Sequence, residues 1–368
     1  MKKPLFIIVA CASFLTISQL AYAQGCVAVR HFSNFSNPSA GNQAFLQPGE
    51  WTLNTDYRYF RSFRHFRGTH EEPQRVANDT EVINWQHALD ISVSYAITSR
   101  LIANVTLPLV YNERSSLYEH GGEGRFTTMA SGLADMRVGA SYWLLDPYAN
   151  PRGNIVAGLG VRLPTGDPSA EDRFYNVGPN GSSEMRPVDQ SIQPGDGSWG
   201  LTFELEAGRR LTNNIGLFLS GFYLVSPEEM NDTPTNRRIE EAYMSVADQY
   251  RLRGGISYLF SDNWSATLGG RYEGVPVKDL IGGNEGFRRP GYIWSVEPGI
   301  AYSVNRFSVS LNVPVALVRA RPQSVPDMQI SEATGQRRVG DAAFADYLIN
   351  VGLTWHFGRS GAETKTFF

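Results

Sequence analysis

Apolar and polar residues alternate with a period of two along most of this chain, and this pattern constrains the fold more than any other feature. In the segment 87–95, Leu89, Ile91 and Val93 alternate with aspartate and serine. Successive side chains of a β-strand point to opposite faces, so each such segment forms a strand with one apolar face and one polar face. The pattern predicts an all-β protein.

The alternation recurs in twelve segments. We expect strands near residues 51–66, 86–97, 101–112, 132–145, 153–163, 199–210, 215–225, 249–260, 264–274, 291–304, 307–318 and 346–357. Most of these segments have the roughly 9–11 residues that a tilted strand needs to cross a bilayer.

Short and long connections alternate between these strands. The short ones are 98–100, 146–152, 211–214, 261–263 and 305–306; the long, polar ones are 67–85, 113–131, 164–198, 226–248, 275–290 and 319–345. Outer-membrane barrels have short periplasmic turns and long extracellular loops. We therefore predict a single antiparallel up-and-down transmembrane β-barrel over residues 51–357.

The two ends of the chain lie outside this predicted barrel. Lys2 and Lys3 precede an apolar run, and Ala21-Tyr22-Ala23 resembles a signal-peptidase site, so residues 1–23 are predicted to be a signal peptide. Residues 24–50 form an irregular segment for the lumen or the periplasm, and 358–368 form a tail. These features predict the outer membrane of a Gram-negative bacterium.

Charge and cysteine content exclude other classes. Removing the two signal-peptide lysines changes the formal net charge from −3 to −5, which is too mild to indicate a nucleic-acid partner. The mature chain keeps only Cys26, so it has no intrachain disulfide. No cofactor is expected.

The polar faces of the predicted strands carry many charged residues. The candidates for lining the lumen are Asp56, Arg58, Asp90, Asp135, Arg137, Arg162, Glu204, Glu206, Arg251, Arg253, Arg271, Glu273 and Glu297. Twelve strands enclose more space than the eight-stranded barrel that side chains fill, so we place these charges inside and the apolar faces against lipid. The inward-facing charges either set selectivity at a constriction or neutralise one another.

Two sets of residues do not fit regular paired strands. Pro108, Pro298 and Pro314 lie within predicted strands, where proline cannot donate a ladder hydrogen bond, so each is expected at a bulge or strand end. The inward face of 215–225 carries Phe218, Phe222 and Leu224. That wall is either part of an apolar ligand site or packed by an interior plug.

Two motifs resemble a known family. Gly132-Leu-Ala-Asp-Met-Arg-Val-Gly-Ala-Ser-Tyr142 and Gly160-Val-Arg-Leu-Pro-Thr-Gly-Asp-Pro168 are similar to the outer-membrane barrels known as putative MetA-pathway phenol degradation proteins, and Val296-Glu-Pro-Gly-Ile-Ala-Tyr302 fits the same style. The resemblance spans about residues 86–357. It implies a transport-like role for hydrophobic or aromatic compounds.

Catalytic and metal-binding signals are weak. His87 is the one histidine at an apolar-face strand position. A membrane phospholipase would need a Ser–His pair on that face. For His87 we favour a position at the membrane interface over this catalytic role. The acid-rich loop 164–198 follows no calcium-binding template. We expect a solvated loop there, with inward folding as the alternative, and we predict no metal site and no enzyme.

The sequence thus predicts a barrel that passes small solutes passively, with hydrophobic or aromatic compounds as the candidate solutes. The alternatives are a plugged structural or adhesive barrel with partner-binding loops and, less favoured, a lipid hydrolase. Expected partners are outer-membrane lipid, small-molecule solutes and the barrel-assembly machinery. That machinery recognises the last strand of a barrel, which here would end at Phe357. The chain continues to Phe367-Phe368, so either aromatic end could serve as the signal.

Overall fold

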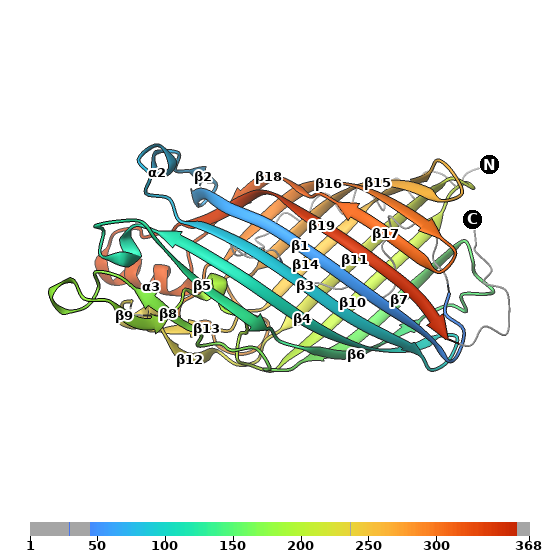
Figure 1. Ribbon diagram of the computed structural model, residues 1–368, viewed down its shortest axis with the longest axis horizontal. Coiled ribbons are helices and arrows are strands. Elements are labelled where there is room, and N and C mark those ends of the chain that lie inside the picture. The colour runs from blue at the N-terminus through green and yellow to red at the C-terminus, as the bar shows by residue number, and fades with distance from the viewer. Residues whose placement is uncertain (1–28, 30–44, 236, 359–368) are drawn as a thin grey trace.

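Strand pairing closes the sheet into a barrel. In the computed structural model, which describes residues 29, 45–235 and 237–358, β1 (Glu50–Arg67) pairs with β3 (Ile83–Ala96) on one side and with β19 (Ala342–Gly358) on the other. Every pairing in the wall is antiparallel, and consecutive strands are neighbours (Figure 1). The predicted fold class is confirmed: the chain is a closed twelve-strand antiparallel barrel of the bacterial outer membrane.

Ten wall positions are single strands and two are each shared by two strands. Besides β1, β3 and β19, the wall contains β4 (Leu101–Ser116), β5 (Phe126–Leu133) followed by β6 (Arg137–Trp143), β7 (Gly153–Arg162), β10 (Gly200–Arg210), β11 (Ile215–Val225), β14 (Gln249–Leu259), β15 (Trp264–Val275), β16 (Gly291–Val304), and β17 (Phe307–Asn312) followed by β18 (Val315–Ala320). The predicted strand 132–145 is therefore interrupted at 134–136, and 307–318 is interrupted at 313–314.

Pro314 lies in the second break, whereas Pro108 and Pro298 lie within β4 and β16, each facing a break in the neighbouring strand. The carbonyl of Pro108 accepts the N–H of Ala134 in the first break, and the carbonyl of Pro298 accepts the N–H of Val313 in the second, where Pro314 also lies. Where one strand is broken, its carbonyl groups do not need a backbone N–H from the neighbouring strand. Proline, which has no N–H, is therefore tolerated at these positions. The prolines mark breaks in the wall and not ordinary ladder positions.

Apolar side chains face outward, toward lipid. Trp264, Trp294 and Trp355 are 41%, 48% and 51% exposed, and they share their faces with exposed leucines and isoleucines. Tyr292 and Tyr302 lie ten residues apart on β16. That spacing is about 33 Å along a strand and about 25 Å of height at a typical tilt, the height of the apolar band between two aromatic girdles.

The extra elements lie at one end of the barrel (Figure 1). They belong to the long loops: β2 (His70–Glu71), α2 (Gln74–Ala77), β8 (Glu171–Phe174), β9 (Glu184–Pro187), β12 (Met230–Pro234), β13 (Tyr243–Ser245) and α3 (Val325–Thr334), with four 3-10 turns, Tyr118–His120, Pro179–Gly181, Gln190–Ile192 and Ile239–Glu241. The predicted segregation of short and long connections is confirmed.

Some predictions concern the two ends of the chain, part of which lies outside the described residues. The predicted signal peptide 1–23 lies outside the described residues, as do Cys26 and 359–368. Glu50 begins β1 and pairs with Gly358, which ends β19, so the wall is one residue longer at each end than the predicted range. No helix among the described residues is long and apolar enough to cross a membrane.

Candidate functional site

Part of loop 164–198 folds into the extracellular end of the barrel. The side chain of Gln86 on β3 donates to the carbonyl of Ser191 (2.5 Å), and that of Asn112 on β4 donates to the carbonyl of Ile192 (3.0 Å). Ser191 is 5% exposed and Ile192 is fully buried. The expectation of a solvated loop is therefore wrong for this stretch, because inward-facing wall residues bind its backbone, and the inward-folded alternative is correct.

Asp189 is the electrostatic centre of this inserted stretch. Its carboxylate accepts two hydrogen bonds from Arg289, at 2.7 and 2.6 Å, and lies 3.6 Å from Arg114 and from Arg237. Burial alone would raise the pKa of Asp189, but Arg114, Arg289 and Arg237 hold it well below its usual range. Arg114 lies among the last residues of β4, whereas Arg289 precedes β16 in a distant part of the wall, so Asp189 bridges the mouth.

A second part of the same loop fills the first wall break. The Thr165 hydroxyl donates to the carbonyl of Ala134 (2.9 Å) and accepts the N–H of Met136 (2.8 Å). A Cβ on Gly166 would stand 2.6 Å from the Cα of Gly195, so the two backbones can cross only as glycines. The Leu-Pro-Thr-Gly-Asp motif thus supplies hydrogen-bond partners to the backbone groups of the broken strand.

The sequence analysis placed Asp135 on the inward face of a strand, but the residue lies in this break. Its carboxylate accepts the N–H groups of Gly166 (3.0 Å) and Asp196 (2.8 Å). Arg162 in turn pairs with Asp196 at 2.5 Å and lies 4.0 Å from Asp135. Asp135 therefore anchors the loop to the wall.

The other predicted charges lie on the inward faces, and several pair directly. Arg271 binds Glu273 at 2.7 Å and lies 3.7 Å from Glu297, which also accepts from Arg253. Adjacent inward positions on the wall strands carry Asp56, Arg58, Asp90, Arg137, Glu204, Glu206 and Arg251. Seven carboxylates and six guanidinium groups make up the predicted set. This balance favours mutual neutralisation over a field of one sign.

An apolar strip interrupts the charged lumen. Phe222 and Leu224 on β11 are each 4% exposed and pack against Val29, and Phe218 lies on the same face. Guanidinium carbons sit over two of these rings: that of Arg137 lies 5.5 Å from the Phe222 centroid, and that of Arg253 lies 5.9 Å from the Phe218 centroid. The strip gives the lumen one wall suited to an apolar molecule.

Val29 places one residue of the predicted N-terminal segment inside the barrel. Its N–H donates to Glu273 (3.0 Å), and its carbonyl accepts from Arg58 (3.2 Å). These partners lie on β15 and β1. The other residues of the segment up to 44 lie outside the described ones.

His87 lies on the outward face and contacts tyrosines. Its Nδ1 is 2.7 Å from the Tyr57 hydroxyl, and its ring centroid is 4.9 Å from that of Tyr59. A phenol in place of a serine gives no support to the hydrolase alternative. Within residues 29, 45–235 and 237–358, no three His, Cys, Asp or Glu side chains are grouped to hold a metal ion.

The sequence did not single out Asp189 beyond its place in an acidic loop. Its arginine partners Arg237, Arg114 and Arg289 lie 48, 75 and 100 residues from it, so no local spacing reveals the cluster.

Comparisons with known proteins agree with this architecture. The sequence family described as putative MetA-pathway of phenol degradation matches residues 92–317, and no curated protein matches the chain by sequence. An outer membrane channel from Pseudomonas putida F1 is structurally similar, with a TM-score of 0.57, 14% identity, and coverage of 89% of this chain and all of that one. A FadL homologue of Pseudomonas aeruginosa (TM-score 0.44, 11% identity, 90% and 99% covered) and the Ralstonia pickettii toluene transporter TbuX (0.43, 10%, 92% and 97%) resemble it more distantly.

Proposed function

Since the chain belongs to the family of putative MetA-pathway phenol degradation proteins, we propose that it is a passive outer-membrane channel for small hydrophobic solutes, aromatic compounds among them. The single observation that carries this proposal is the inward-facing strip of Phe218, Phe222 and Leu224 in a lumen whose charged residues are nearly balanced in sign.

The chemistry of the lumen suits apolar cargo better than ions. Arg253, Arg271, Glu273 and Glu297 bind one another. Paired charges leave a weak net field, so they attract small ions less than a ring of one sign would. An apolar molecule entering the lumen gains contact with the aromatic strip and leaves water, which is favourable in proportion to the area buried.

A plugged structural barrel is the second candidate. The cross-mouth bridge at Asp189 and the hydrogen bonds that hold Val29 in the lumen favour it. The two candidates differ in what reaches the strip. A channel admits an apolar solute to Phe222 from outside, and a permanently plugged barrel does not.

Photo-crosslinking separates these candidates. Intact outer membranes are exposed to a diazirine-bearing phenyl probe, and labelled peptides are mapped by mass spectrometry. We expect labelling of 217–225 on inward residues, competed by excess toluene and reduced at least fivefold by Phe222→Asn. The control is Phe203→Asn on the outward face, where the side chain is 46% exposed. Labelling that is confined to outward residues, or that Phe222→Asn leaves unchanged, would overturn the proposal.

A further inference from the structure

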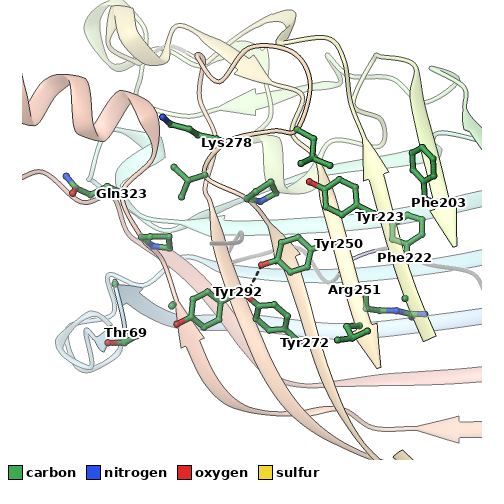
Figure 2. A pocket seen from close by; sticks show the side chains of 18 of the residues that line it. Thr69, Phe203, Phe222, Tyr223, Tyr250, Arg251, Tyr272, Lys278, Tyr292 and Gln323 are labelled. Atoms are coloured by element: carbon green, nitrogen blue, oxygen red, sulfur yellow. Dashed lines mark hydrogen bonds between the residues drawn. The ribbon is translucent and has the colours of Figure 1, made fainter. Parts of the chain in front are cut away.

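A cavity of 1180 Å³ opens on the outward, lipid-facing side of the wall, at the extracellular end (Figure 2). Four tyrosines line it, one each from β11, β14, β15 and β16: Tyr223, Tyr250, Tyr272 and Tyr292. They have the same outward parity as Leu252, which also lines the cavity and is 47% exposed. The cavity therefore lies mainly on the outward face, although the inward-facing residues Glu204, Phe222 and Arg251 also line part of it.

The four tyrosines form a continuous aromatic surface. Neighbouring ring centroids are 6.4 Å apart for Tyr223 and Tyr250, 5.3 Å for Tyr250 and Tyr272, and 5.7 Å for Tyr272 and Tyr292. The Tyr250 and Tyr272 hydroxyls are 3.1 Å apart, and the Tyr223 hydroxyl donates to Asp248. Rings with an apolar body and a hydrogen-bonded polar tip are typical of the boundary between acyl chains and headgroups.

Three extracellular loops border the tyrosine surface. Pro276, Val277, Lys278 and Leu280 come from the loop between β15 and β16, and Figure 2 shows Lys278 on that loop. Met328 of α3 and Arg337 after it come from the loop between β18 and β19. Gly68 and Thr69 come from the loop after β1. The cavity thus combines an aromatic floor with a rim of three loops, two of which contribute one cation each.

The two rim cations have no carboxylate to neutralise them. Lys278 and Arg337 are exposed, and neither forms an ion pair with any residue that the structure describes. The nearest acid in sequence, Asp279, is held by Arg288 through hydrogen bonds of 2.6 and 2.9 Å. Asp248 is fully buried and accepts the N–H of Leu280, and Glu204, a carboxylate that lines the cavity, lies on the inward face of β10. The rim therefore presents unpaired positive charge directly above the aromatic surface.

We propose that this groove binds a phosphate-bearing glycolipid of the outer leaflet, with a phosphate at Lys278 and Arg337 and an acyl chain along Leu252 and the tyrosines. Cations beside an interfacial aromatic belt lie at the height of lipid phosphates. An uncharged hydrophobic solute would use the apolar floor but would leave both cations without a partner. The lipid uses both parts of the groove.

Native mass spectrometry of the intact barrel tests the headgroup assignment. The purified protein is offered bis-phosphorylated lipid A and the same lipid after dephosphorylation. We expect at least tenfold tighter binding of the phosphorylated form, and loss of that preference in Lys278→Gln/Arg337→Gln. Arg61→Gln is the matched control, because Arg61 is exposed on the outward face of β1 outside the groove. Equal binding of the two lipids, or an unchanged preference in the double variant, overturns the proposal.

A second pair of variants tests the acyl-chain assignment. Leu280 is 69% exposed at the groove, and Ile239 is 87% exposed on a loop that does not line it. Leu280→Ser is expected to weaken lipid A binding at least threefold, whereas Ile239→Ser is expected to leave it unchanged. An equal effect of both variants overturns the assignment of an acyl chain to this groove. A heat-shift gel on every variant confirms that the barrel is folded, so loss of binding cannot be attributed to misfolding.

Discussion

Arg289 and Asp189 form a two-point ion pair inside the extracellular mouth, with N–O distances of 2.7 and 2.6 Å. The two residues are a hundred positions apart in sequence, and Arg114 and Arg237 flank the same carboxylate at 3.6 Å. This geometry ties an inserted loop to separate parts of the barrel. It therefore makes Asp189 the residue on which closure of the mouth depends.

Replacing Asp189 with asparagine should open the mouth. The amide removes the charge that holds three arginines together, and those arginines then repel one another. We expect single-channel conductance in planar bilayers to rise at least twofold. Glu171→Gln is the control, because Glu171 is an exposed carboxylate of the same loop. An unchanged conductance in Asp189→Asn would show that other contacts close the mouth.

The wild-type mouth should stay closed on mild acidification. The pKa of Asp189 is depressed in the folded state, so its stabilising contribution is present above the unfolded value of about 3.9 and is lost only as pH falls through the lower folded value. Conductance measured from pH 8 to pH 4 should therefore be flat. A rise between pH 7 and pH 5 would contradict this account of the mouth.

Gly195→Ala should destabilise the barrel. The added Cβ would stand 2.5–2.6 Å from backbone atoms of Gly166, and neither backbone can move without breaking the contacts of the wall break. We expect a loss of roughly 1–3 kcal/mol, typical of overpacking. Urea unfolding followed by gel shift measures it. Gly270→Ala, whose Cβ would have no neighbour within 4 Å, should unfold like the wild type.

Glu297→Gln should shift the ion preference of the lumen toward anions. Glu297 is 4% exposed and contacts both Arg253 and Arg271, so its neutralisation leaves their charges less compensated. Reversal potentials in a salt gradient, recorded in the Asp189→Asn background, measure the preference. Glu113→Gln on the outward face is the control. No shift relative to that control would argue that these charges do not face the permeation path.

Alternation along single strands was enough to predict which face of each strand points inward. Leu89 and Asp90 differ in face because they are adjacent in a strand, which is a local property. The same reasoning gave the strand number and the segregation of loop lengths. Pro108 and Pro314 signalled irregularities, but the extent of each break depends on pairing with other strands.

The mouth and the outer groove could not be predicted because their contacts are long-range. Asp189 meets Arg289 only after the barrel has closed, and Lys278 reaches the rim of the groove through the path of its loop. Asp135 was predicted on a strand face, yet the break at 134–136 turns it toward Gly166. In each of these cases tertiary packing, and not the period of two, fixes the position.

We propose that this barrel carries small hydrophobic solutes across the outer membrane. The proposal is tested by the initial uptake rate of radiolabelled toluene and of glycerol by cells with an intact lipopolysaccharide layer, with and without the protein. We expect the protein to accelerate toluene uptake at least fivefold and to leave glycerol uptake unchanged, and Phe222→Asn to remove most of the gain. Equal acceleration of both solutes, or no acceleration of toluene, would contradict it.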